Sequence, residues 1–556
     1  MQIKFLLLLI SLLSFWLLAW WFARSRNAAD GVSWLDSGFH EGTFRRVVLC
    51  GVFGAAIGQI LEPATMLPTG AAGALFGLWI SRKETHYAVK SGASDVLQDV
   101  SKIHALAAPF DPAPYIKKAR KAGRDEVFLG LDHSRRPILF PRTKLDKNHV
   151  EILGESGVGK SSLAGVLLTQ LAAAGECVIV IDPKADRMLP GVLARASSEY
   201  GFPVTNIDLR FGKPPQLNPF LNARRDQVEE LLQVALELGK TGSGAVDFYR
   251  GKDREATGYM AAAFADGETS MPELLEKAAD DERVTQNENL WREFRQIARV
   301  PAFNVHQGQG GHDLEKLIQR GGVIYITGST TRLEVQAGQK LILQRVMQIL
   351  DERCDQSQSV AIFLDELKYI LSPAALRAAG TIRDRNVHLL FAHQSIGDLS
   401  DCPGLDPMAV RGAIWGNSGI KIAYKMLDAE TARELSLISG DRAVLETRTT
   451  ENDDGVSVAQ SIGKASHMPA HIFTHLPKPA GEEASVGVVI GDGPAYFLST
   501  RWLEAGPPPE PISAPPRLTE PAATAPDEPD YVAIEAAPVD GRSSCARETD
   551  FDDFLR

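Results

Sequence analysis

The sequence predicts an α/β domain built on a parallel sheet, with apolar segments before it and a proline-rich acidic tail after it. Three patterns lead to this prediction. An apolar strand at 149–153 leads through a glycine-rich loop into an apolar helix. Two later apolar strands, ECVIVID and SVAIFLDEL, run into acidic residues. Helical periodicity interrupts the alternation between 221 and 320, so we expect an α/β unit with an all-helical insertion.

The bulk composition limits the class of protein without choosing one. A chain of 556 residues exceeds one ordinary core, so we expect about two to four units. Its five cysteines show no CxxC pair and no metal-binding spacing. The formal net charge is −11, and residues 505–556 contribute −7 of it from 11 acidic and 4 basic side chains. The total therefore neither indicates nor excludes a nucleic-acid partner.

The first predicted unit, residues 1–82, is a membrane anchor. Residues 5–23 form a stretch of 19 residues without a charge, which as a helix would span roughly 28 Å, close to the ~30 Å hydrocarbon core of a bilayer. Trp20 and Trp21 lie at its end, where interfacial aromatic residues belong. A cleavable signal peptide is the alternative, but the apolar run is long for one and no A-x-A site follows.

The number of membrane spans stays open. Residues 47–80 form a second apolar stretch, but Glu62 and Pro63 near its middle would be costly in a bilayer and would break a helix. This stretch forms either one protruding span or two short arms, which gives two or three spans in all. Both arrangements place the chain from residue 81 onward in the cytoplasm.

A phosphate-binding loop follows the strand at 149–153. The segment GESGVGKSS lies between this strand and an apolar helix and matches the GxxxxGK[ST] pattern, so a chance match in a glycine-rich loop is the weaker interpretation. The backbone amides would hold phosphates, Lys160 would reach the terminal phosphates, and the Ser161 hydroxyl would bind Mg²⁺. The predicted nucleotide-binding residues are Gly154, Glu155, Ser156, Gly157, Val158, Gly159, Lys160, Ser161 and Ser162.

The strand in SVAIFLDEL runs into Asp365 and Glu366, the pattern of a Walker B motif. Asp365 would hold Mg²⁺ through water, and Glu366 would polarise the attacking water. The next apolar strand ends on Gln394, 29 residues after Asp365. A buried amide needs hydrogen-bond partners. The pattern resembles that of RecA-like motors, in which the strand beside Walker B ends on a polar residue that contacts the γ-phosphate or the attacking water, and this resemblance implies the same role for Gln394. The alternative is that Gln394 only caps its strand. The predicted catalytic residues are Lys160, Glu366 and Gln394, and the predicted metal ligands are Ser161 and Asp365.

Four further segments follow the anchor. Residues 83–220 hold a linker, a basic segment and the first part of the nucleotide-binding domain. Residues 221–320 form the helical insertion, in which RRDQVEELLQVALELG shows helical spacing with Gly239 as a stop. Residues 321–504 form the second part of the domain. Residues 505–556 contain ten prolines and should be disordered.

The tail ends in RETDFDDFLR, where Phe551, Phe554 and Leu555 stand among four acidic residues. One interpretation is a solubilising tail. The other is a docking motif, in which the acids steer it to a basic partner and the apolar side chains anchor it.

Taken in order, these motifs resemble a known family. The phosphate-binding loop, IDPKAD, LNPF at 217–220, LDE and FAHQS follow one another behind N-terminal membrane segments. This order is similar to that of the type IV secretion coupling proteins, the TraD/TraG-like DNA-transfer ATPases of conjugation in the RecA-like P-loop superfamily. The resemblance covers roughly residues 1–500.

The resemblance implies ATP and Mg²⁺ as cofactors and a homo-hexameric motor at the bacterial inner membrane, with its ATPase domain in the cytoplasm. The motor would recruit a relaxase–DNA complex and pass it to components of the type IV secretion channel. A ring motor also needs an arginine from the neighbouring subunit, for which Arg383, Arg385 and Arg124 are candidates, although an ordinary solvated role suits each of them equally well. Some coupling proteins carry an acidic tail that binds a relaxosome protein, so residues 545–556 are a candidate docking site.

Two alternative functions stay open. A nucleotide-dependent receptor for protein effectors of a secretion system would use the same motifs as a switch, and the sequence does not separate protein cargo from DNA cargo. A segregation-type DNA translocase would share the core. Such translocases usually carry more membrane spans and a C-terminal winged-helix DNA reader, for which the proline-rich end leaves no room.

Overall fold

The computed structural model divides into two compact units, Met1–Asp99 and Val100–Arg556. The described residues are Ala71 and 103–514, apart from 122–124, 240–243, 265–268, 404 and 453–454. The predicted membrane segments 5–23 and 47–80 lie outside them except for Ala71, and so do Arg124 and residues 515–556. Within this described part of the chain, no helix is both long and apolar enough to cross a bilayer.

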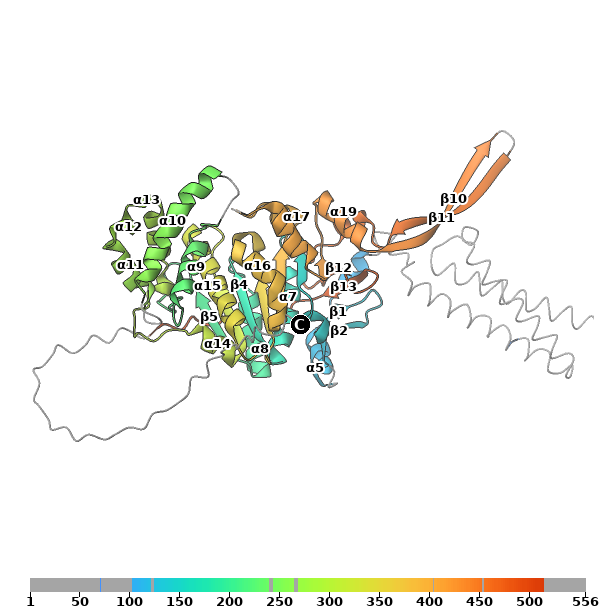
Figure 1. The fold of residues 1–556 in the computed structure, drawn as a ribbon. Coiled ribbons are helices and arrows are strands. Elements are labelled where there is room, and N and C mark those ends of the chain that lie inside the picture. The colour runs from blue at the N-terminus through green and yellow to red at the C-terminus, as the bar shows by residue number, and fades with distance from the viewer. Residues whose placement is uncertain are drawn as a thin grey trace, which may run out of the picture. The chain divides into compact units, whose positions relative to one another are not determined.

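Across the described residues, eleven strands form one sheet (Figure 1). The run from β9 to β5 is parallel and is called here the parallel half. The other four strands are antiparallel and are called the antiparallel half. In spatial order the strands are β2 (Pro137–Pro141), β1 (Glu126–Leu131), β13 (Tyr496–Thr500), β12 (Ser485–Ile490), β9 (Ile420–Ala423), β3 (Val150–Leu153), β8 (Val387–His393), β7 (Val360–Leu364), β4 (Cys177–Asp182), β6 (Gly322–Thr327) and β5 (Val204–Asp208).

Both faces of the parallel half are buried, which explains why its strands read as continuous apolar runs. Along β4, Val178 and Val180 pack into one core cluster, whereas Ile179 and Ile181 pack into another. Helices α7 (Lys160–Ala173) and α8 (Leu189–Tyr200) contribute to the first cluster. Helix α15 (Leu333–Glu352) and the helical insertion contribute to the second. The strands predicted around the motifs are therefore confirmed as β3, β4, β7 and β8.

Helices fill the predicted insertion between β5 and β6 and share their core with α15. The predicted helix over RRDQVEELLQVALELG ends before its expected stop at Gly239. Its last residue is Ala235, because Glu237 takes a left-handed backbone conformation (φ +53°) and the amide of Leu238 turns back to the carbonyl of Gln233 (2.9 Å). The insertion consists of α9 (Arg225–Ala235), α10 (Gly244–Ala262), α11 (Met271–Ala279), α12 (Glu282–Thr285), α13 (Glu288–Ile297) and α14 (Leu314–Arg320).

The last two strands of the chain join the sheet next to β9, which is the neighbour of β3 on the side opposite β8. Strands β12 and β13 pair with each other, and β12 pairs with β9. Between β9 and β12 the chain forms helix α19 (Ala429–Ile438) and a two-stranded hairpin. The hairpin, β10 (Asp441–Asn452) and β11 (Gly455–Ser466), projects from the sheet beyond α19 (Figure 1).

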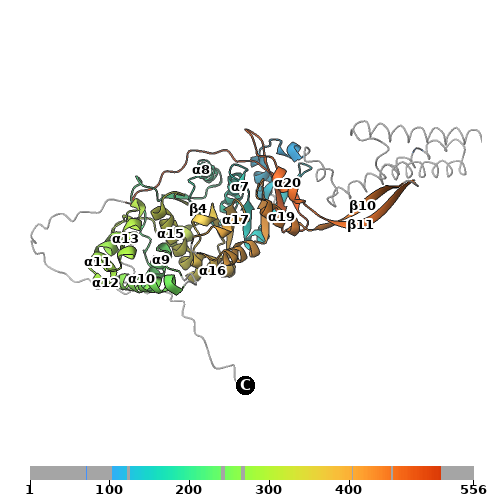
Figure 2. The same cartoon turned by 90° about the horizontal axis from the view of Figure 1, so that it is seen from above.

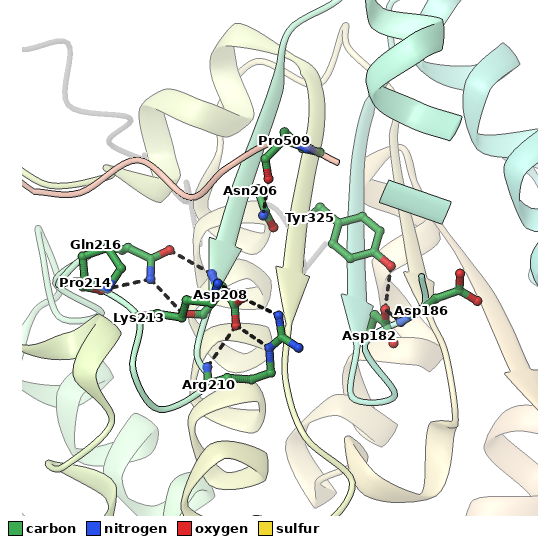
Figure 3. A network of polar contacts seen from close by, with 10 residues as sticks. All are labelled: Asp182, Asp186, Asn206, Asp208, Arg210, Lys213, Pro214, Gln216, Tyr325 and Pro509. Atoms are coloured by element: carbon green, nitrogen blue, oxygen red, sulfur yellow. Dashed lines mark hydrogen bonds and ion pairs between the residues drawn. The ribbon is translucent and has the colours of Figure 1, made fainter. Parts of the chain in front are cut away.

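Residues 501–514 follow β13 and are called here the strap. They run as an extended segment along α8 toward the β5 edge of the sheet (Figure 2). The sequence predicts disorder from Ala505 onward, and the structure differs up to Ala514 because backbone groups, which need no apolar side chains, anchor the segment. The hydrogen bonds run from Gly506 N to Gly191 O (2.9 Å), from Asn206 Nδ2 to Pro509 O (2.7 Å, Figure 3) and from Ala514 N to Pro215 O (2.7 Å).

Candidate nucleotide site

The parallel half gathers the predicted motifs at one edge of the sheet. Strands β3, β8, β7 and β4 are consecutive neighbours, and their carboxyl ends lie together. The register pairs Leu153 with His393 and Leu364 with Phe391, so the phosphate-binding loop, Gln394 and Asp365 leave the sheet side by side. Ligands of open α/β sheets bind at this edge.

The phosphate-binding loop has room only for glycine at its key turns. Gly154, Gly157 and Gly159 have φ values of +143°, +76° and +115°, which side chains of L-residues rarely allow. A Cβ on Gly159 would lie 2.0 Å from the Ser485 hydroxyl oxygen. Ser485 begins β12, so the antiparallel half forms one wall of the loop.

Lys160 and Ser161 begin α7 with their side chains already engaged. The ammonium of Lys160 donates to the carbonyls of Gly154 (2.6 Å) and Glu155 (3.0 Å). Burial lowers the pKa of Lys160, while the charge of Glu366 opposes this shift. The hydroxyl of Ser161 donates to Asp186 Oδ2 at 2.8 Å. Bound phosphates would take the ammonium from the loop carbonyls, which are weaker partners for a cation.

Asp365 and Glu366 are both buried just beyond the end of β7, with 5% and 6% of their surfaces exposed. Burial, followed by the charge of Asp182, raises the pKa of Asp365 to about 7. Glu366 adopts a left-handed backbone conformation (φ +43°), which is unfavourable for a non-glycine residue.

Gln394 lies where the sequence predicts it, directly after β8 and beside the Walker B acids. Its side-chain nitrogen is 3.5 Å from Glu366 Oε2, and its backbone amide donates to Asp398 Oδ2 at 2.8 Å. The side chain is half-buried and turned toward the carboxylate rather than toward its own strand. This geometry suits a residue that orients water between Glu366 and a phosphate.

Among the described residues, no cluster of three or more His, Cys, Asp or Glu side chains is arranged to hold a metal ion by itself. Mg²⁺ does not need such a cage, because it usually binds through one or two carboxylates together with substrate phosphates and water. The pair predicted from the sequence, the Ser161 hydroxyl and the Asp365 carboxylate, fits this mode of binding.

The loop at residues 182–186, called here the 182–186 loop, belongs to the site although the sequence analysis assigned it no role. Asp182 is 1% exposed, and its carboxylate accepts hydrogen bonds from the backbone amides of Lys184 (2.9 Å) and Asp186 (2.7 Å) and from the Tyr325 hydroxyl (2.6 Å) (Figure 3). The ammonium of Lys184 lies 3.6 Å from Glu366 Oε1. The motif IDPKAD was the available signal, but it does not show which side chains meet.

A buried polar triad joins the strand before the phosphate-binding loop to its two neighbours. Glu151 on β3 contacts His393 Nε2 on β8 at 2.7 Å and the Lys421 ammonium on β9 at 3.0 Å. Burial alone would raise the pKa of Glu151, but the hydrogen bond and charge of His393 and the charge of Lys421 outweigh it and lower that pKa. His393 immediately precedes Gln394, so the triad connects β8, which leads to Gln394, with β3, which leads to the phosphate-binding loop. The contact could not be predicted from the sequence, because each of the three strands contributes only one polar residue and the strands are far apart along the chain.

A cavity of about 190 Å³ opens at the phosphate-binding loop. Gly157, Lys160 and Lys184 line its phosphate end. Pro479, in the loop before β12, and Trp502, in the strap, also line it. The guanidinium of Arg501 lies 5.1 Å from the centre of the Trp502 ring. An aromatic and apolar wall beside a phosphate loop suits a nucleobase.

The candidate trans-acting arginines lie away from this edge. Arg383 and Arg385 belong to a 3₁₀ turn (Ile382–Arg385) just before the start of β8, whereas the nucleotide site lies at its other end. Arg385 forms an ion pair with Asp351 (3.1 Å), and Arg383 lines a separate surface cavity. Their contact with a neighbouring subunit stays a prediction, and Arg124 lies outside the described residues.

Comparisons with known proteins match this arrangement. Residues 359–478 match the family model described as the TraM recognition site of TraD and TraG, and residues 129–186 match the central domain of the helicase HerA. Mobilization protein A of Escherichia coli is 29% identical over 310 residues, which cover 55% of this chain and 56% of that protein. The chain therefore matches only about half the length of this curated relative.

Solved structures show the same fold. The conjugative coupling protein TrwBdeltaN70 in its unbound form superposes with a TM-score of 0.51 and 15% identity, over 70% of this chain and 92% of that one. The plasmid coupling protein TrwB in complex with ADP and Mg²⁺ gives a TM-score of 0.50 and 14% identity, over 70% and 93% of the two chains. The fold is therefore the RecA-like α/β fold. Motif order, the two family-model matches and the curated relative support a type IV secretion coupling protein of the TraD/TraG-like kind.

Proposed function

We propose that this chain is a membrane-anchored ATPase that couples a relaxase–DNA substrate to a type IV secretion channel and drives conjugative DNA transfer by ATP hydrolysis. One observation carries the ATPase part, namely the meeting of Lys160, the Walker B acids and Gln394 at one edge of the parallel half. The match to a TraM recognition site and to a mobilization protein supports a relaxosome partner.

The residues have distinct roles in the proposed mechanism. The loop amides and Lys160 hold the β- and γ-phosphates, and Ser161 and Asp365 would hold Mg²⁺, which would neutralise phosphate charge when bound. The water oxygen forms a bond to the γ-phosphorus while the bond to the bridging oxygen breaks and its electron pair leaves with ADP. Glu366 accepts the proton of the water, and Gln394, 3.5 Å from that carboxylate, orients the water.

Assembly extends the proposal beyond one chain. A homo-hexamer at the bacterial inner membrane, anchored by the segments within residues 1–82, would hold the ATPase domain in the cytoplasm. Arg383, Arg385 or Arg124 would then reach the γ-phosphate bound by the neighbouring subunit. The resemblance to coupling proteins supports this assembly, and the channel components would be its membrane partners.

The deciding experiment measures ATP hydrolysis by the full chain in detergent, with and without DNA. A motor should hydrolyse ATP several-fold faster with DNA, because its turnover is coupled to cargo. Hydrolysis that is indifferent to DNA would contradict the DNA-motor proposal and favour a receptor for protein effectors. The variant Lys160→Ala serves as the baseline for contaminating ATPases.

The tail has its own test. Deleting residues 545–556 should reduce conjugative transfer in a mating assay, because the acidic and aromatic end would no longer dock the relaxosome protein. ATP hydrolysis by the same truncated protein should stay at the full-chain level. Unchanged transfer would contradict the docking role and leave a solubilising tail.

A further inference from the structure

The 182–186 loop is held in one shape by a buried carboxylate. Asp182 is the last residue of β4. Its carboxylate accepts hydrogen bonds from two backbone amides of its own loop and from the Tyr325 hydroxyl. Ala185 lies in the left-handed region (φ +56°), which costs free energy for a residue with a Cβ. Strained loops of this kind persist where the surrounding contacts fix them, and they gather at functional sites.

Two side chains of this loop contact the proposed catalytic groups. Lys184 lies 3.6 Å from Glu366 Oε1, and Asp186 accepts a hydrogen bond from Ser161 at 2.8 Å. Gln394 lies 3.5 Å from the other oxygen of Glu366. Without nucleotide, the proposed base is therefore paired with a cation, and the proposed Mg²⁺ ligand is paired with an anion.

The exposure of the pair shows which partner can move. The Lys184 side chain is 35% exposed, whereas that of Glu366 is only 7% exposed and belongs to a strained backbone. Lys184 also lines the same cavity as Lys160 and Ser161. A flexible ammonium at the rim of a phosphate cavity can turn from a carboxylate to a phosphate without any movement of the backbone.

The charges favour that turn when a triphosphate arrives. The charges of Lys184 and Lys160 both lower the pKa of Asp365 against the larger effect of burial. A γ-phosphate carries more negative charge than one carboxylate and offers more acceptor oxygens, so it is the stronger partner for an ammonium. ADP has no terminal phosphate at this position.

We propose that Lys184 is a second phosphate-binding lysine that pairs with Glu366 in the nucleotide-free protein and transfers to the γ-phosphate of ATP. The transfer frees the Glu366 carboxylate to accept the proton of the attacking water. This inference rests on the proposed ATPase function and adds to it a residue that distinguishes ATP from ADP.

The test is nucleotide binding rather than activity. The full chain in detergent is titrated with a non-hydrolysable ATP analogue and, separately, with ADP, both with Mg²⁺. Lys184→Ala should weaken binding of the analogue by about tenfold to a hundredfold, the range for a charge-assisted hydrogen bond. Its affinity for ADP should stay within about twofold. Lys184→Arg should restore much of the loss, because it keeps a cation at the cavity rim.

The matched control is Arg187→Ala. Arg187 is an exposed basic residue three positions later that is not among the residues lining the cavity, so both affinities should be unchanged. An equal loss for ADP and the analogue would assign Lys184 a structural role and overturn the inference, and so would the absence of any loss. Failure of the wild-type protein to bind either nucleotide would instead refute the nucleotide site itself.

Discussion

The two halves of the sheet meet where β12 pairs with β9, and they give the phosphate-binding loop two unlike sides. On the parallel side, Asp182, Asp365 and Glu366 crowd together with two lysines, in backbone conformations that include a strained turn. On the antiparallel side, Ser485 and Trp502 form a wall for the same loop, the tryptophan beside apolar Pro479. Charged side chains on a strained backbone are suited to the hydrolysis step, whereas an aromatic and apolar wall is suited to binding the base of the nucleotide. The comparison therefore predicts that turnover depends on the parallel side and base affinity on the antiparallel side.

Lys160→Ala should break the site as a whole. Removing the ammonium that donates to the loop carbonyls, and that would hold the terminal phosphates, should lower ATP hydrolysis by at least about 10³-fold. A phosphate-release assay measures the change. The control is Lys118→Ala, which alters an exposed lysine on helix α5 (Ala113–Lys121). Hydrolysis that survives in the Lys160 variant would place the reaction elsewhere.

Glu151→Ala tests the contact that joins β3 to its two neighbours within the parallel half, β8 and β9. The substitution leaves His393 and Lys421 buried without their carboxylate, so the free energy of unfolding should fall by about 3–5 kcal/mol. Urea unfolding of the Val100–Arg556 unit measures it. The control is Glu199→Ala, which removes an exposed ion pair with Lys117 and should change the free energy of unfolding far less than Glu151→Ala does.

The wild type and the Glu151→Ala variant should also differ in how their stability depends on pH. The pKa of Glu151 is lowered on folding from its ordinary value of 4.5, so its contribution is fully present above that value and is lost as the pH falls through the folded pKa. The stability difference between wild type and Glu151→Ala should therefore shrink in acid. A difference that grows as the pH falls below 4.5 would contradict the lowered pKa.

Gln394→Ala should separate chemistry from binding on the parallel side. The variant should bind ATP almost normally but lose turnover on the order of 10²-fold, because the attacking water loses its orientation next to Glu366. Binding and hydrolysis are measured on the same preparation. Gln319→Ala, an exposed glutamine on α14, is the control. Normal hydrolysis by Gln394→Ala would leave that residue only a strand cap.

Trp502→Ala should have the smallest effect and only on the antiparallel side. Loss of base stacking should weaken ATP binding by about tenfold, from a stacking contribution of roughly 1–3 kcal/mol. Tripolyphosphate, which lacks a base, should compete equally well for the wild type and the variant. Trp291→Ala, in the helical insertion, is the control. Equal losses for ATP and tripolyphosphate would show that Trp502 supports the loop and not the base.

The sequence was sufficient where function lies at the junction of a strand and its own loop. The phosphate-binding loop, Asp365, Glu366 and Gln394 each follow an apolar strand, and local pattern identifies such junctions. It could not supply contacts between distant segments. Glu151 and His393 are 242 positions apart, and Lys184 meets Glu366 only because β4 and β7 are neighbours. The wall made by Ser485 and Trp502 likewise depends on the return of the chain to β9.

The strap fixes the point at which the remaining C-terminal tail, residues 515–556, leaves the folded domain. Ala514 is hydrogen-bonded to Pro215, so residue 545 lies 31 residues from a fixed point on the folded domain. As the flexible chain that its composition predicts, this segment would have an average reach of about 30 Å and a limit of about 105 Å. A partner bound by the proposed docking motif at the end of the tail would then be held near the folded domain. Its effective concentration there would be far above its concentration in solution. The affinity of the docking motif itself could then be modest, and loosening the strap would dilute the captured partner without changing any contact that it makes.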